Sequence, residues 1–296
     1  MNFHLRHKSS SLLAAFVAVI MFLPSESVTA QHTELGLMAG TMAYTGDVIH
    51  TYMRHNDYQP AFGIFIAKPV SSHFSLRLML NKGYISGADS LAARPSSRER
   101  NLSFYSDLYE GSVLVDFYPF AFLPTKGRNK IAPYFSTGLT VFHFNPMSIY
   151  QGQEYALQPL STEGQGTSAF PDRKPYQLTQ IAIPAEMGIK FMIGNSFSLN
   201  VAGGFRYTFT DYLDDVSTTY VNADVLIAER GEVAYALSNR TWGTNEGVPD
   251  DLGNGSKRGG LANDHYGWIG TTLSYYFAPR YKFAQSRKSG LHCPKF

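Results

Sequence analysis

The feature that most constrains this chain is an alternation of apolar and polar residues that continues for more than ten residues at a time. In the segment Phe197–Thr210, apolar side chains at every second position alternate with mostly polar or small ones. A period of two residues is typical of a β-strand with one apolar face. Strands of soluble proteins usually have about 5–6 residues, whereas strands of membrane barrels have about 9–11. The length of the pattern therefore favours a membrane barrel over a soluble sandwich.

Eight segments of the chain share this pattern, and the connections between them alternate between long and short. Outer-membrane barrels have such short turns on one side and long loops on the other. The sequence therefore predicts an all-β fold, an eight-stranded antiparallel transmembrane outer-membrane β-barrel over residues 31–277, with four extracellular loops and both chain ends in the periplasm. The predicted strands are Glu34–Tyr44, Ala61–Pro69, Phe74–Leu80, Leu102–Tyr118, Ala132–Phe144, Leu178–Ile193, Phe197–Thr210 and Tyr266–Phe277.

The composition agrees with a protein whose surface largely faces lipid. Charged residues make up 16% of the 296 residues, against about 25% in soluble domains. The net charge of +2 is too close to zero to indicate a nucleic-acid-binding protein. A single cysteine excludes an internal disulfide and a cysteine-based zinc cluster.

Residues 1–30 have the features of a secretory signal peptide. Arg6 and Lys8 provide a basic start, residues 12–23 form an apolar run, and Val28, Thr29 and Ala30 are a small-residue cleavage site. The apolar run is too short for a membrane-spanning helix, which needs about 20 residues. We therefore expect an exported chain that begins near residue 31.

Charged residues occur on the polar phase of the predicted strands, which faces the lumen. An eight-stranded barrel has an interior just wide enough for side chains to fill, and unpaired charges there are costly. The sequence therefore predicts a plugged lumen in which three acidic and three basic side chains pair, and an ion path is the less favoured alternative. The six residues are Arg77, Glu110, Asp116, Glu186, Lys190 and Arg206.

Several short motifs carry a resemblance to a known family. The most specific are Pro159–Gly166 and the Asp211–Ser217 part of Thr210–Ser217. The others are Glu34–Gly36, Gly40, Tyr44–Asp47, Phe142–Pro146, Ile183-Pro184 and Gly188–Lys190. With these motifs the chain resembles the PorG-like outer-membrane barrels of type IX secretion bacteria. The resemblance implies a non-enzymatic component of the type IX secretion system, without a cofactor, whose partners are periplasmic ring proteins such as PorK and PorN.

The segment 278–296 contains five basic residues, no acidic residue and the lone Cys293. An unpaired cysteine in an exported protein suggests an intermolecular disulfide or a reactive thiol. We expect this tail to dock a periplasmic partner through Cys293, Arg287 and Lys288. The alternative is a basic end that only contacts anionic lipid head groups.

Three aspartates follow the seventh predicted strand, and their oxygens could hold calcium. The spacing of Asp211, Asp214 and Asp215 does not match an EF-hand, so we favour a solvated loop and predict no metal site. The connection from residue 211 to residue 265 is too long for a simple hairpin. It is predicted to form a partly folded outer cap.

Two other classes of function remain open. A lipid-acting enzyme would need a serine and histidine pair such as Ser148 and His143, but the chain has no Gly-x-Ser-x-Gly motif. An adhesin or small-solute binder would use the loops. A local feature is also predicted at Pro184, where proline should cause a β-bulge in its strand.

Overall fold

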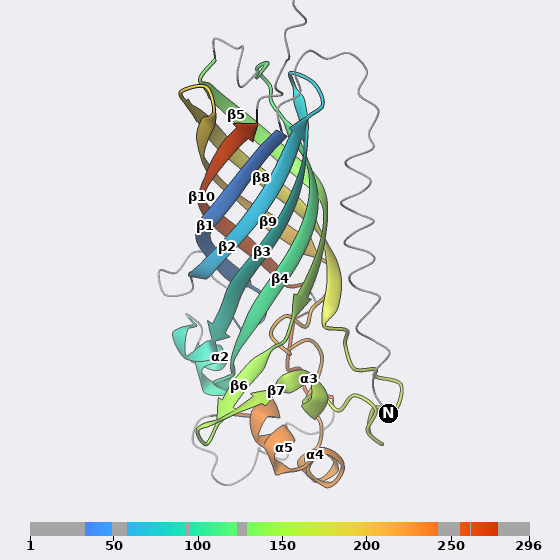
Figure 1. The fold of residues 1–296 in the computed structure, drawn as a ribbon. Coiled ribbons are helices and arrows are strands. Elements are labelled where there is room, and N and C mark those ends of the chain that lie inside the picture. Colours follow the sequence, from blue (N-terminus) through green and yellow to red (C-terminus); the bar gives the residue numbers. More distant parts are fainter. Residues whose placement is uncertain are drawn as a thin grey trace, which may run out of the picture.

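The computed structural model describes residues 33–48, 58–92, 95–122, 129–241, 255–260 and 262–277. Eight long antiparallel strands within these ranges form a closed barrel (Figure 1), which confirms the predicted fold class. The predicted signal peptide (1–30) and basic tail (278–296) lie outside the described residues. The barrel strands are β1 (Thr33–Thr45), β2 (Gln59–Pro69), β3 (Phe74–Ala88), β4 (Ser103–Phe117), β5 (Ile131–Phe144), β8 (Thr179–Ile193), β9 (Phe197–Thr208) and β10 (His265–Phe277).

Each of these strands pairs with two neighbours, so the barrel has no free edge along its wall. The first and last strands close it, with pairs that run from Thr33↔Phe277 to Thr45↔His265. Both ends of the barrel segment therefore lie at the same rim. A closed sheet satisfies its backbone hydrogen bonds internally, which is what a strand in hydrocarbon requires.

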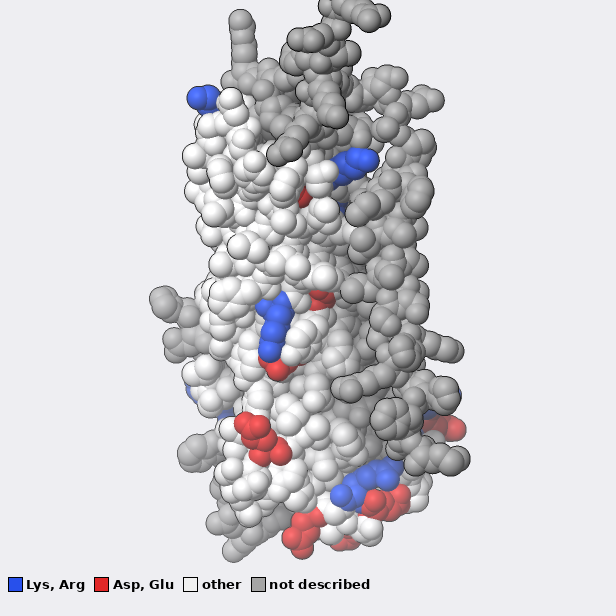
Figure 2. Space-filling model, viewed as in Figure 1, with Lys and Arg blue, Asp and Glu red and all other residues white. Residues whose placement is uncertain are grey.

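The two faces of the wall differ as the alternation predicts. On β9, Leu199 and Val201 are exposed on the outside, whereas Ser198 and Asn200 are buried in the lumen. Figure 2 shows that the described surface over the strands is largely free of charged side chains, which gather toward the end of the molecule that carries the helices. An apolar outer wall with a polar interior is the pattern of an outer-membrane barrel.

A folded cap covers the rim opposite the chain ends of the barrel (Figure 1). We call the described residues of 145–178 and 209–264 the cap. The sequence predicted long connections here but not the hairpin that one of them contains. The cap comprises β6 (Met147–Tyr150), β7 (Gln153–Ala156), α3 (Leu157–Leu160), α4 (Ala223–Arg230) and α5 (Glu232–Ser238), while η1 (Asp89–Leu91) and α2 (Pro95–Arg100) belong to the β3–β4 connection.

Helices are short throughout the part of the chain that the structure describes. None of them is long and apolar enough to cross a membrane.

The predicted bulge at Pro184 is wrong. The β5–β8 register is the same on both sides of the proline, from Thr140↔Ala182 to Thr137↔Ala185, so neither strand contains an extra residue. Instead the ladder is interrupted locally, and the carbonyl of Pro184 accepts a hydrogen bond from Thr137 Oγ1 at 2.9 Å. A neighbouring hydroxyl thus supplies one of the contacts that the backbone lacks there.

The outward direction of Leu78 gives a first testable prediction. Leu78 lies on β3 between the buried Arg77 and Met79, so Leu78→Arg places a charge in the apolar wall. We expect the variant to lose about 2–4 kcal/mol of folding stability, as arginine does near a bilayer midplane. Equilibrium unfolding from lipid vesicles measures this loss. Leu78→Ala, the matched control, removes the side chain without adding charge, and equal losses in both variants would contradict the assigned face.

Candidate functional site

Five of the six predicted lumen residues form one continuous chain of ion pairs. Arg77 Nη2 lies 2.9 Å from Asp116 Oδ1 and 2.8 Å from Glu186 Oε2. Arg206 Nη2 lies 2.9 Å from the other oxygen of Glu186 and 2.8 Å from Glu110 Oε1. Each cation therefore bridges two carboxylates. The alternation of charge links β3, β4, β8 and β9 across the interior.

The sixth residue, Lys190, belongs to a separate pair. Its ammonium contacts both oxygens of Glu34, at 2.8 and 3.0 Å, and both side chains are buried. Glu34 also accepts a hydrogen bond from Ser274 Oγ at 2.6 Å. Glu34 is not among the six predicted lumen residues, although its inward phase on the first predicted strand was a sufficient signal.

Neutral polar side chains complete the hydrogen bonding of these carboxylates. Tyr266 Oη and Asn81 Nδ2 donate to Glu110 at 2.9 and 2.6 Å, and Trp268 Nε1 donates to Glu186 at 3.2 Å. Such buried charges are retained only when partners satisfy most of their oxygens and protons. The buried ion pairs thus link the strands across an interior that also contains apolar side chains such as Met79 and Leu114.

The two most specific motifs of the sequence are bonded to each other inside the cap. Glu163 is fully buried, and its carboxylate accepts hydrogen bonds from the backbone of Ser217 and Thr218, from Tyr212 Oη and from Arg258. These contacts join the 159–166 segment to the 211–217 region. We call this the Glu163 junction, because one carboxylate ties two distant loops together.

A neighbouring carboxylate reinforces the Glu163 junction. Asp215 accepts hydrogen bonds from Thr162 Oγ1 and, at 2.8 Å, from Tyr176 Oη. Burial raises the pKa of Asp215 to about 6, an effect that Arg258 opposes. Gly164, between these contacts, adopts φ +71°, and a Cβ there would lie 2.5 Å from a methyl carbon of Val221. Glycine is therefore required by both conformation and space.

The favoured interpretation of the aspartate segment as a solvated loop is wrong. Asp214 and Asp215 are buried, with exposures of 2% and 0%. Their side chains belong to different clusters, since Asp214 accepts a hydrogen bond from Tyr44 whereas Asp215 accepts one from Tyr176. Within the described ranges, no group of three His, Cys, Asp or Glu residues could hold a metal ion. The calcium alternative therefore has no support in the geometry.

The residues weighed for an enzyme do not pair in the structure. His143 faces outward, and its Nδ1 lies 3.0 Å from Thr179 Oγ1. Ser148 Oγ instead donates to the carbonyl of Ser103 at 2.8 Å. The predicted partner-binding residues of the tail, Arg287, Lys288 and Cys293, lie outside the described residues.

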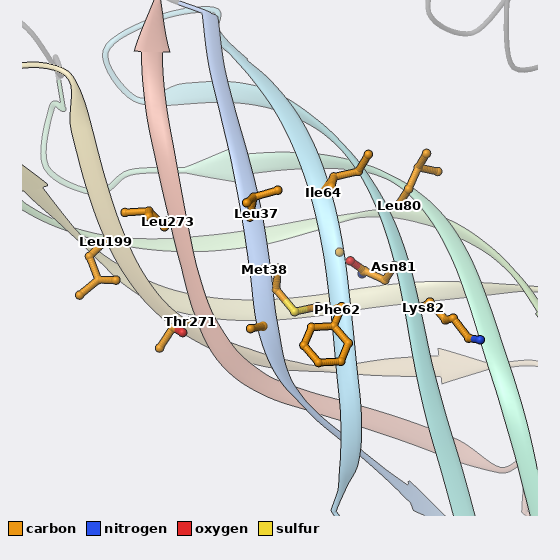
Figure 3. A pocket seen from close by; sticks show the side chains of 12 residues that line it. Leu37, Met38, Phe62, Ile64, Leu80, Asn81, Lys82, Leu199, Thr271 and Leu273 are labelled. Carbon is orange, nitrogen blue, oxygen red and sulfur yellow. The ribbon is translucent and has the colours of Figure 1, made fainter.

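A groove of about 710 Å³ runs along the outer wall (Figure 3). A row of directly paired side chains crosses five strands, and the smaller Ala39 and Thr271 lie beside it. The groove opens on the apolar wall, so in a bilayer hydrocarbon chains would cover it. The row consists of Leu199, Leu273, Leu37, Ile64 and Leu80.

The sequence matches the family model of a domain of unknown function, DUF6089, over residues 13–226. The chain belongs to the DUF6089 family. No curated protein matches it. This family assignment covers most of the barrel and both segments of the Glu163 junction, but it brings no activity with it.

Solved structures similar to this DUF6089 chain include small outer-membrane proteins. Ail, the attachment invasion locus protein of Yersinia pestis, is 8% identical, with a TM-score of 0.38 over 83% of this chain and 99% of Ail. OprG from Pseudomonas aeruginosa is 8% identical, with a TM-score of 0.39 over 84% of this chain and 97% of OprG. Neisserial surface protein A has the same identity and TM-score over 83% and 97%. At these identities the similarity says nothing of function.

The isolated Glu34–Lys190 pair allows a clean test of the buried charges. Lys190→Met leaves Glu34 buried without its cation, and we expect a loss of about 3–5 kcal/mol of folding stability. The double variant Glu34→Gln with Lys190→Met should lose less, because no charge is left alone. A double-mutant cycle by equilibrium unfolding measures the coupling.

Lys82 provides the matched control for this cycle. Its ammonium lies 3.7 Å from Asp107 Oδ1, but both side chains are more than half exposed. Lys82→Met should therefore not lower the free energy of unfolding, because Lys82 lies on the outer wall, where an apolar side chain is at least as favourable as a charged one. Equal effects at Lys190 and Lys82, or strictly additive losses at Glu34 and Lys190, would contradict the role of burial.

The Glu163 junction gives a separate prediction about the cap. Glu163→Gln keeps the shape but removes the charge that Arg258 and the two backbone amides contact. We expect the cap to lose about 3 kcal/mol of local stability, because hydrogen bonds to charged groups contribute about 1.5–3 kcal/mol each. Hydrogen exchange of the Ser217 and Thr218 amides measures the loss. The exposed Glu99→Gln variant is the control, and unchanged exchange in Glu163→Gln would contradict the junction.

Proposed function

We propose that this chain is a non-enzymatic outer-membrane component of the type IX protein secretion machinery, which anchors or docks periplasmic ring proteins of the PorK and PorN kind. The observation that carries the proposal is the network of buried ion pairs in the interior. Seven charged side chains occupy the lumen, and the cap lies over one rim. A barrel built in this way suits a role as an anchor in the membrane better than a role as a conduit.

The motifs that resemble PorG-like barrels support the same proposal. Pro159–Gly166 and Thr210–Ser217 are far apart in sequence, but Glu163 and Thr162 of the first bond directly to Ser217 and Asp215 of the second. The two most specific motifs of the resemblance therefore form one interlocked unit. This supports a shared cap structure, from which a shared role follows as a proposal.

The position of the barrel ends supports a docking role for the tail. The last strand ends at Phe277, on the rim opposite the cap. With the cap outside the cell, this rim faces the periplasm. Five basic residues in the tail would attract an acidic partner surface. Cys293 could then form a disulfide with a partner cysteine in the oxidising periplasm.

Cross-linking in native outer membranes tests this proposal. The full chain, Cys293→Ser and a chain ending at Phe277 are each expressed and captured. We expect a heavier band that reductant removes, together with ring proteins, in the unaltered chain only, and impaired secretion in both variants. Lys82→Gln, which changes an exposed charge on the barrel wall, is the control and should behave as the unaltered chain. A monomer insensitive to reductant, with normal secretion in all variants, would remove the docking role.

A second candidate is a loop-based adhesin or solute binder. The observation in its favour is that the cap has an apolar core of its own, formed by Val221, Leu226 and Ala234 with Leu160 and Phe170 packed against it. A surface supported in this way can present a fixed binding face. Binding of a host or nutrient ligand that the Glu163→Gln variant loses, without capture of ring proteins, would favour this class. Activity on lipid A would instead favour a lipid-acting enzyme.

A further inference from the structure

A buried tyrosine lies between two buried carboxylates where the cap meets the barrel. Tyr44, near the end of β1, directs its hydroxyl oxygen to Asp214 Oδ2 at 2.5 Å and to Asp264 Oδ1 at 3.0 Å. All three side chains are at most 2% exposed. The single phenolic hydrogen of Tyr44 is therefore the only hydrogen that its hydroxyl can donate to two carboxylates, each with an oxygen within 3.0 Å of Tyr44 Oη.

Each carboxylate also holds backbone of a different segment. Asp214 accepts hydrogen bonds from the amides of Val48 and Val216, at 3.1 and 2.9 Å, and Asp264 accepts one from Leu213 at 2.8 Å. The cluster thus ties together the residues that follow β1, the loop that follows β9 and the residue that precedes β10. The space is filled tightly, since a Cβ at Gly46 would lie 1.8 Å from Asp264 Oδ1.

The charged groups that face this cluster do not neutralise it. Asp47 follows β1 and Asp211 follows β9, and each raises the pKa of a carboxyl group of the cluster when it is ionised. Asp211 itself titrates in a similar range, because burial raises its pKa to about 7. The cation that acts on Asp214 is Arg100 of α2, but its guanidinium already forms two hydrogen bonds with Asp89, at 2.7 and 2.8 Å. Phe104 of β4 packs edge-on against the Tyr44 ring. Among the described residues, no salt bridge reaches either Asp214 or Asp264.

We propose that Tyr44, Asp214 and Asp264 form a proton-dependent latch that holds the cap on the barrel rim. When the two carboxyl groups share one proton, that proton and the phenolic hydrogen of Tyr44 supply a hydrogen bond for each of the two tyrosine–carboxyl contacts. The cap then stays closed. When both carboxyl groups are ionised, two buried charges share the single hydrogen of Tyr44 and the closed state is destabilised. The closed cap therefore binds one proton more than the open cap.

The direction of the pH dependence follows from this difference. Burial raises the pKa of Asp214 and of Asp264 above the usual range, and in Asp264 the charge of Asp214 adds to the shift. A carboxyl group whose pKa is raised in the closed cap makes its full stabilising contribution when the pH is below the ordinary aspartate pKa of about 3.9. The stabilisation is lost as the pH rises through the raised pKa. With one extra proton bound, the ratio of closed to open caps falls up to about tenfold per pH unit in that window.

Hydrogen exchange of the full chain in lipid bilayers tests the latch between pH 5 and pH 9. The reporters are the amides of Val48, Leu213 and Val216, because they donate to the two carboxylates. Their protection, corrected for the intrinsic pH dependence of exchange, should fall with rising pH by up to about tenfold per unit. Amides in the middle of β9 should not change, which separates opening of the cap from unfolding of the barrel.

Two variants decide whether the carboxyl pair is responsible. In Asp264→Asn, the side-chain amide nitrogen can donate a hydrogen bond to Tyr44 Oη. The variant therefore has at every pH the hydrogen that protonation provides in the unaltered chain. We expect its reporter amides to lose the pH dependence and to be at least tenfold better protected than the unaltered chain at pH 9. Asp214→Asn should also reduce the pH dependence of reporter-amide protection. It replaces Asp264→Asn in the test if that variant does not fold.

Exchange of the same reporter amides provides the control and the result that would contradict the latch. Asp172→Asn removes an exposed carboxylate of the cap and should keep the pH dependence of the unaltered chain. The latch is overturned if protection of the reporter amides in the unaltered chain is independent of pH. It is equally overturned if both asparagine variants retain the full pH dependence. The test does not depend on ring proteins or secretion, so it stands apart from the proposed function.

Discussion

The constraint on which the rest of the structure depends is that a charge inside a closed barrel must find its partner in the protein. Arg206 is completely buried and meets this requirement by bridging Glu110 and Glu186. Removing one partner from such a pair typically costs 3–5 kcal/mol. A one-residue slip of β9 would move Arg206 into the apolar wall and Phe205 into the lumen. The charges of the interior therefore help to fix the register of the strands around them.

The need of a buried charge for a partner in the protein also determines the structure of the cap, where the charged residues lie on loops rather than on strands. Glu163 satisfies its carboxylate with backbone amides and Arg258, and thereby fixes the path of residues that have no regular secondary structure. The segments that are most specific in the sequence are those that make these contacts. Four polar residues of these segments therefore have a structural role, because Glu163 and Thr162 of the first bond to Tyr212 and Asp215 of the second.

The sequence predicted the parts of the fold that depend on local periodicity. The strand predicted at Glu34–Tyr44 is observed at Thr33–Thr45. The strand predicted to end at Leu80 continues to Ala88, because the exposed Lys82 interrupts the apolar phase while pairing with β4 continues. Periodicity reports which face a side chain occupies, but hydrogen bonding between strands does not require that face to be apolar.

Contacts between distant segments cannot be predicted from the periodicity of the sequence. The inward phase of Lys190 was evident, but its pairing with Glu34 depends on how four intervening strands are registered around the barrel. Likewise, Asp214 and Asp215 have the composition of a solvated turn, and they are buried only because the 159–166 segment and β1 fold against them. Their environment is a property of the assembled cap.

The seam between β1 and β10 sets the order of events during biogenesis. Its residues are among the most distant in the chain, from Thr33 to Phe277, and contacts of such separation form late because a long loop must close first. Until the last strand is present, the sheet has two open edges that can pair with other chains. Closure of the barrel therefore waits until the final strand has been delivered to the membrane, and the two open edges must be protected until then.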